Sequence, residues 1–186
     1  INGLVIGLLA MGLVLVFRSN RIINFAVGNM GLVGASVLAL LVLNYGWPVW
    51  LAAIVAALIG VSLGAIVELV VVRRLFNAAR VTLLVATIGV AQVMQALVAL
   101  LPKLRGVTAA NYPLAVSGRW QRFGVSISGA QISIALAVPV IACALAWFLN
   151  RTRVGVAVIA AADNPRLART QGINPKLVST MVWMIA

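Results

Sequence analysis

The sequence contains no histidine, one cysteine and only two acidic residues in 186 positions. A single cysteine, Cys143, excludes an intrachain disulfide and a dithiol redox motif. Metal sites and acid–base catalysis draw mainly on histidine, cysteine and carboxylate side chains, and only Glu68 and Asp163 carry a carboxylate. We therefore expect neither catalytic residues nor a metal-binding set, and no enzymatic activity in this chain.

Charge is also scarce. Charged residues make up 9% of the chain and hydrophobic residues 64%. In a soluble domain, about 25% of the residues are charged and about 45–50% are hydrophobic. Such a chain cannot cover its own surface with polar groups. The composition excludes a soluble domain or a disordered segment and predicts a polytopic membrane protein.

Fourteen lysine and arginine residues give a net charge of +12. These cations are not gathered in one segment but fall in short breaks between apolar runs, where membrane proteins place them. We interpret them as charges that set the topology, and we expect no nucleic-acid partner.

The apolar runs predict an all-α fold, a polytopic transmembrane helical bundle, because a spanning helix needs about 20 apolar residues. About six spans are expected, at 2–17, 29–43, 49–72, 82–101, 131–149 and from 177 onward, the last one truncated. The sequence begins with Ile1 and its last apolar run stops at Ala186, so we treat 1–186 as one transmembrane domain that is a fragment of a longer polypeptide, apparently truncated at both ends.

Two longer polar segments separate these spans. With the first span running inward, the inner segments hold ten cations and the outer ones four. The positive-inside rule then places 102–130 as an extracytoplasmic loop and 150–176 as a cytoplasmic loop. Alternation over 120–127 predicts a small hairpin within the outer loop.

The cytoplasmic loop carries the signals of a short helix. Asp163 or Asn164 can cap its start, Pro165 suits its first turn, and Gly172 can adopt the left-handed conformation that ends a helix. A helix of two turns is not stable alone in water, so it must pack against something. From these residues it is either an ordinary connector or a helix that docks into a groove on a cytoplasmic partner.

Glu68 is the one acid within an apolar span, where a charged group costs at least about 2.5–3.5 kcal/mol. It precedes Arg73 by just over one helical turn, near the predicted inner interface. We favour a structural ion pair between Glu68 and Arg73, because a proton relay would need a second titratable partner within the spans.

Polar and small residues mark two other places in the spans. Asn24, Asn29 and the glycines at 28, 31 and 34 indicate either a broken helix that lines a cavity or close helix packing. Thr87, Gln92 and Gln95 are expected on roughly one side of a helix, facing a pathway or bonding to neighbouring helices.

Four stretches resemble one family. The pattern Ala162-Asp163-Asn164-Pro165, then Ala168, then Gly172-Ile173-Asn174 resembles the cytoplasmic coupling loop of ABC importer permeases of the branched-chain amino-acid class. Three further stretches resemble that family in the same order. They are Ile22-Ile23-Asn24-Phe25-Ala26-Val27-Gly28, then Glu68 with Arg73, Leu75 and Arg80, and then Thr87-Ile88-Gly89 with Gln92 and Gln95. The resemblance rests on four matches in register over 22–176. Two positions depart from it: the family often carries a polar or imidazole side chain at Val27 and a carboxylate at Asn29, which bears on the substrate more than on the mechanism.

The resemblance implies a permease subunit that moves branched-chain or related amino acids across the bacterial inner membrane. The chain has no G-x-x-x-x-G-K-[ST] loop, so ATP would be hydrolysed by separate ABC ATPase subunits. We expect no cofactor on this chain itself. A second permease subunit, the same or homologous, a soluble substrate-binding protein and membrane lipid would be its other partners. The alternative function is a secondary transporter or channel that needs no ATPase.

The resemblance also implies site residues. The ATPase-coupling loop would use Ala162, Asp163, Asn164, Arg166, Ala168, Arg169 and Gly172. The substrate pathway would be lined by Asn24, Phe25, Gly28, Asn29, Thr87, Gly89 and Gln92.

Overall fold

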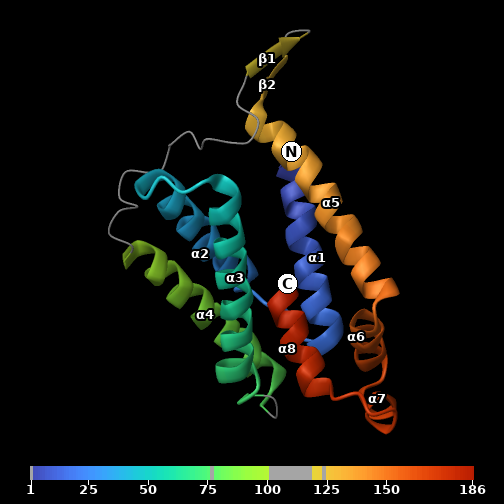
Figure 1. Ribbon diagram of the computed structural model, residues 1–186. Helices are drawn as coiled ribbons and strands as arrows, with labels where there is room; N and C mark the ends of the chain where they lie inside the picture. The colour runs from blue at the N-terminus through green and yellow to red at the C-terminus, as the bar shows by residue number, and fades with distance from the viewer. Residues whose placement is uncertain (1, 76–77, 101–118, 123–124) are drawn as a thin grey trace.

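The computed structural model describes residues 2–75, 78–100, 119–122 and 125–186 (Figure 1). Five helices in it are long and apolar enough to cross a membrane: Asn2–Asn20, Val27–Asn44, Val49–Val72, Arg80–Leu100 and Gln131–Arg151, with a shorter apolar helix at Lys176–Ile185. This confirms the predicted all-α polytopic bundle.

The chain forms eight α-helices, two π-helical turns and one hairpin within its described residues. In order they are α1 (Asn2–Asn20), α2 (Val27–Ala39), η1 (Leu40–Asn44), α3 (Val49–Val67), η2 (Glu68–Val72), α4 (Arg80–Leu100), β1 (Arg119–Arg122), β2 (Val125–Ser128), α5 (Gly129–Arg151), α6 (Arg153–Asp163), α7 (Pro165–Thr170) and α8 (Pro175–Ile185). Each π-helical turn continues the preceding α-helix without a break.

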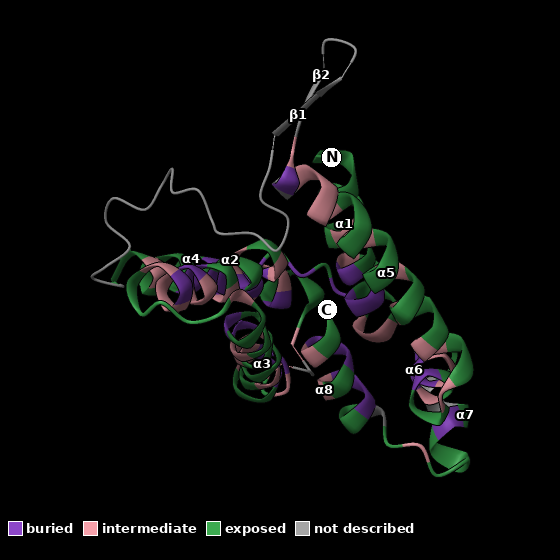
Figure 2. Cartoon of the chain, turned by 45° about the horizontal axis from the view of Figure 1, so that its top comes forward, coloured by how far each residue is buried: buried purple, intermediate pink, exposed green. Residues whose placement is uncertain are grey.

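Helix α8 lies between two groups of helices. On one side α2 packs against α3 and α4, and on the other α1 packs against α5 and α6; α8 contacts α3, α1 and α6 (Figure 1). Its residues Val182 and Trp183 are among the most deeply buried side chains. Figure 2 shows buried stretches on α2, α4, α6 and α8, while much of α1 and α5 is exposed.

Two glycines allow this central helix to approach its neighbours. A Cβ atom on Gly12 of α1 would lie 2.8 Å from the Ala186 carbonyl oxygen, and one on Gly64 of α3 would collide with the Trp183 carbonyl oxygen. Small residues let helix backbones come this close in a membrane. The close contacts of α8 with α1 and α3 therefore depend on Gly12 and Gly64, neither of which was predicted from the sequence.

The glycines of α2 behave differently. A Cβ atom would meet nothing within 4 Å at Gly28 or Gly31, and at Gly34 only an ordinary contact of 3.5 Å with the Ala56 carbonyl oxygen. Close packing through these three glycines was one of the two expectations, and it is wrong for Gly28 and Gly31.

The small hairpin expected at 120–127 is present, with β1 and β2 antiparallel and registered from Arg119↔Ser128 to Arg122↔Val125. The preceding part of the predicted loop, 102–118, lies outside the described residues.

The segment 150–176, expected to be a loop with one short helix, contains a second helix, α6. Its N-cap is Thr152, whose hydroxyl oxygen accepts a hydrogen bond of 3.0 Å from the Gly155 amide. Gly155, Val158 and Ala162 are buried on one face, at the spacing of an amphipathic helix. This capping residue and this spacing are the signals that could have predicted α6.

Candidate functional site

Helix α7 has the predicted start. The Asn164 side-chain oxygen accepts a hydrogen bond of 3.2 Å from the Leu167 amide, so Asn164 is the capping residue. Asp163 instead ends α6, and its carboxylate lies 3.8 Å from the guanidinium of Arg18, with 68% and 61% of the two side chains exposed. Of the two capping candidates, the structure selects Asn164.

The predicted stop at Gly172 is also present. Gly172 has φ +79°, its amide donates to the Arg169 carbonyl over 3.1 Å, and the Ile173 amide donates to the Ala168 carbonyl over 3.0 Å. These two bonds around a left-handed glycine form a Schellman motif. Ala168 is buried and Ile173 packs against the same core, so the end of α7 is anchored to the bundle.

The remaining surface of this segment faces outward. Leu167 is 63% exposed, and a hollow of about 500 Å³ beside α7 is lined by Arg169, Gly172, Ile173, Asn174 and Lys176. Among the residues expected in the coupling loop, Ala162 and Ala168 are buried, Asp163, Asn164, Arg169 and Gly172 are exposed, and the side chain of Arg166 lies outside the described residues. An exposed leucine beside cations can contact a partner protein.

A polar cluster links the base of α8 to the end of α3. The predicted ion pair is present: Glu68 Oε2 lies 3.4 Å from the Arg73 guanidinium. The Thr180 hydroxyl of α8 donates to the same carboxylate oxygen over 2.8 Å. Arg73 in turn donates to the Thr180 hydroxyl oxygen over 2.9 Å and to the Lys176 carbonyl over 3.5 Å. Glu68 is only 2% exposed, so a buried carboxylate joins two helices that are far apart in the sequence.

The π-helical turn at the end of α3 makes this ion pair possible. Residues five apart in an α-helix point about 140° away from each other. In η2 the Arg73 amide instead donates to the Glu68 carbonyl over 2.8 Å, the five-residue spacing of a π-helix. The wider turn brings both side chains to one face. The sequence predicted the pair, but no local signal predicted the π-helical turn or Thr180.

The chain is not helical between α1 and α2. Buried residues (Ile22, Asn24, Ala26) alternate in this break with exposed ones (Arg21, Ile23, Phe25). The Asn24 side-chain oxygen accepts from the Ala26 amide over 2.9 Å, and the Thr87 hydroxyl oxygen accepts from the Phe25 amide over 3.3 Å. Asn24 and Thr87 are each 1% exposed. Thr87 lies about 10 Å along α4 from Arg80, at 1.5 Å per residue. Non-helical backbone at such a depth needs partners within the protein, and these two side chains provide them.

A cavity of about 480 Å³ adjoins the break. It is largely apolar, and its lining includes Asn24, Met30, Gly31, Gly34, Gly60 and Trp183. The broken helix expected over 28–34 is not found, because α2 is continuous from Val27 to Ala39. Residues 21–26 are the connection between α1 and α2, and Gly31 and Gly34 line the cavity.

The other pathway candidates do not gather around this cavity. Phe25, Gly28, Gly89 and Gln92 are exposed and Asn29 is half-buried. The expectation that Thr87 shares a side of its helix with Gln92 and Gln95 is wrong, because Thr87 is buried while both glutamines are exposed. Residues five apart on an α-helix are separated by about 140°, which accounts for the difference.

Five apolar helices long enough to span a membrane define the chain as a multi-pass integral membrane protein. The family described as "Branched-chain amino acid transport system / permease component" matches residues 1–186, and the chain belongs to this family. The resemblance inferred from its motifs is thereby confirmed.

Similar proteins come from bacteria and archaea. The high-affinity branched-chain amino acid transport system permease protein LivH of Escherichia coli K12 is 28% identical, covering 99% of this chain and 64% of that protein. BraD of Pseudomonas aeruginosa, a permease protein of the same description, is 29% identical. The match covers 100% of this chain and 65% of BraD. The probable LivH of Methanocaldococcus jannaschii is 27% identical, covering 96% and 58%. The chain thus spans less than two thirds of the length of these relatives. No solved structure matches it.

Proposed function

We propose that this chain is the major part of the permease subunit of an ABC importer for branched-chain or related amino acids, located in the bacterial inner membrane. The proposal rests on the family, on the names of the relatives and on one structural observation: α7 is capped at both ends, anchored through Ala168 and exposes Leu167 beside cations.

Helix α7 is the proposed docking element for an ABC ATPase subunit. The Schellman motif at Gly172 and the cap at Asn174, whose side-chain oxygen accepts from the Lys176 amide over 3.0 Å, connect α7 stiffly to α8. Movement of α7 would therefore displace α8, which lies between the two groups of helices. ATP and the transported solute would then bias the same equilibrium between inward- and outward-open states, as coupling requires.

The break between α1 and α2, with the buried Asn24, and its cavity are the proposed part of the substrate pathway within this chain. An amide beside apolar walls suits an amino acid with an aliphatic side chain. The exposed glutamines of α4, Gln92 and Gln95, are poor lipid-facing residues. Their exposure supports a contact of this face of α4 with a second permease subunit or with the water-filled pathway. A soluble binding protein would deliver the solute at the end that carries the hairpin.

The test is purification of the tagged full-length protein from its native membrane in mild detergent, with mass spectrometry of the proteins that accompany it. We expect a stoichiometric ATPase that is lost when 163–172 is scrambled. Scrambling 125–128, in the hairpin at the opposite end of the molecule, is the matched control and should leave the ATPase bound.

A preparation that still transports but contains only copies of the permease would overturn the importer assignment. It would favour the alternative function, a secondary transporter or channel. Uptake of labelled leucine by proteoliposomes with the complete complex then tests the substrate class.

A further inference from the structure

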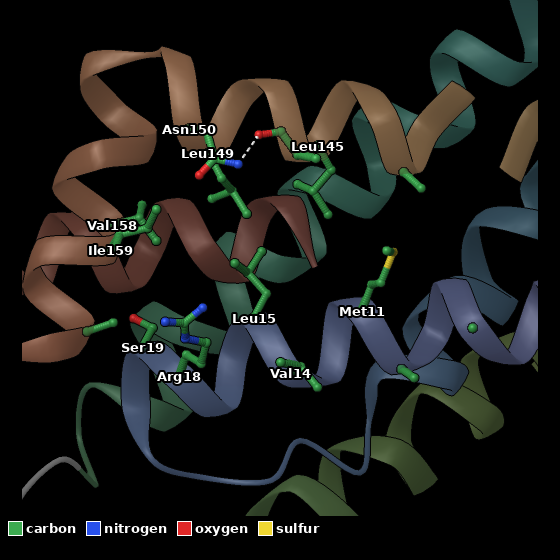
Figure 3. Close-up of a pocket in the computed structure, with 15 residues that line it drawn as sticks. Met11, Val14, Leu15, Arg18, Ser19, Leu145, Leu149, Asn150, Val158 and Ile159 are labelled. Carbon is green, nitrogen blue, oxygen red and sulfur yellow. Dashed lines mark hydrogen bonds between the residues drawn. The ribbon is translucent and has the colours of Figure 1, made fainter. Parts of the chain in front are cut away.

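A second cavity lies between α1, α5 and α6, on the side of the bundle away from α2, α3 and α4. Its volume is about 420 Å³. Apolar side chains form its walls, among them Met11, Val14, Leu15, Leu145, Leu149 and Val158 (Figure 3). In the span Gln131–Arg151 none of the described residues of α5 is buried, so the described part of the chain leaves this side uncovered.

One end of this cavity is polar and the rest is apolar. Figure 3 shows Arg18 and Ser19 at one end of the groove and Met11 at the other, with Asn150 of α5 above the polar end. Arg18 and Ser19 belong to the last turn of α1, at the boundary of the span Asn2–Asn20. The cavity therefore changes from apolar to cationic at the level where the bilayer changes from hydrocarbon to headgroup.

The dimensions fit a lipid chain. The lining runs along α1 from Gly7 to Ser19, about 18 Å at 1.5 Å per residue. One leaflet contributes about 15 Å of a hydrocarbon core about 30 Å thick. An acyl chain can thus follow the groove from the bilayer centre to Arg18.

The charge favours an anionic headgroup. The partner of Arg18 is Asp163, 3.8 Å away, and both side chains are more than half exposed, so this pair holds the guanidinium only weakly. A guanidinium binds phosphate through two parallel hydrogen bonds, and basic pockets between membrane helices bind anionic headgroups.

We propose that this groove binds one anionic phospholipid, with its phosphate on Arg18 and Ser19 and an acyl chain between α1 and α5. The proposal does not depend on the transported solute or on the ATPase.

Native mass spectrometry of the purified full-length protein tests it, with phosphatidylglycerol and phosphatidylcholine of identical acyl chains as the two probes. We expect preferential retention of one phosphatidylglycerol molecule. Arg18→Gln should reduce that retention about five-fold, the effect of one cation near an anionic lipid. Arg21→Gln removes the same charge three residues away, outside the groove, and should leave retention unchanged. Equal retention of the two lipids, or an equal loss in both variants, would overturn the proposal.

A second pair of variants tests the groove itself. Ala146→Phe fills it and should lower phosphatidylglycerol retention, whereas Val140→Phe, on an exposed position of α5 outside the lining, should not. Thermal unfolding of both variants checks that each one is folded. If a photoreactive residue at position 146 labels another part of the full-length chain or a second copy instead of the lipid, the groove is a protein contact and the proposal fails.

Discussion

Glu68 is a buried carboxylate that is tolerated because two side chains from different parts of the chain satisfy it. Arg73 supplies a positive charge at 3.4 Å and Thr180 a hydroxyl at 2.8 Å. Removing one partner of such a group exposes the full desolvation cost of the other, which is larger than the net value of the bond. The threonine therefore stabilises Glu68 alongside the arginine.

Replacing that hydroxyl tests this interpretation. Thr180→Val keeps the shape of the side chain and should lower the free energy of unfolding by about 1–3 kcal/mol. Thr180→Ser keeps the hydroxyl and should stay much closer to the wild type. Thermal melts of the full-length protein in detergent measure both. Equal losses in the two variants would mean that the methyl group, not the hydrogen bond to Glu68, matters at this position.

At the scale of elements, α3 and α8 meet through a glycine. Gly64 leaves no room for a side chain against the α8 backbone, whereas a Cβ atom on Gly60, one turn earlier, would meet nothing within 4 Å. Gly64→Val should separate the two helices and lower stability by at least about 1–3 kcal/mol, as overpacking does. Gly60→Val is the matched control and should preserve the melting temperature. Similar melting temperatures for the two variants would show that the α3–α8 contact is not this close.

The end of α7 depends on a second glycine. Gly172 has φ +79°, where a β-branched residue is strained by about 1–2 kcal/mol and asparagine less. Under the proposed importer function, Gly172→Val should lower the amount of solute taken up per ATP hydrolysed in proteoliposomes, because the link between α7 and α8 would change shape. Gly172→Asn should retain most of the coupling. Unchanged coupling in the valine variant would contradict a docking role for α7.

At the scale of the whole molecule, cations gather at the end that carries α6 and α7. Arg18, Arg73, Arg80 and Arg151 lie at helix ends on this side of the molecule (Figure 1). The positive-inside rule then predicts that this end faces the cytoplasm.

Single cysteines in a Cys143→Ser background test this orientation. Gln171→Cys, after α7, should react with an impermeant maleimide only when the inner face is accessible. Tyr45→Cys, in the turn between α2 and α3 at the opposite end, should react from outside. The reversed pattern would invert the topology and place α7 out of reach of a cytoplasmic ATPase.

Local features of the fold could be predicted from the sequence because their causes are local. The length of an apolar run sets a span, Asn164 and Gly172 sit within hydrogen-bonding reach of the helix ends that they complete, and the hairpin strands are neighbours in the chain. The Glu68–Arg73 pair was predicted from the closeness of the two residues in the chain, but the π-helical turn that brings their side chains to one face was not.

The sequence by itself determined the class of the spans, the capped helix α7 and the family; it predicted about six spans, of which five are long enough to cross a membrane and the sixth is a shorter apolar helix. Only the tertiary structure decided that Thr180, 112 positions from Glu68, completes the polar cluster. It also decided that Thr87 accepts a hydrogen bond from the Phe25 amide, and that Gly64 makes the close contact with α8. The physical reason is that, in a uniformly apolar chain, hydrophobicity inserts each helix into the membrane but does not decide which helices pack together. Close backbone approach and a few buried hydrogen bonds make that choice, and both depend on residues far apart in the sequence.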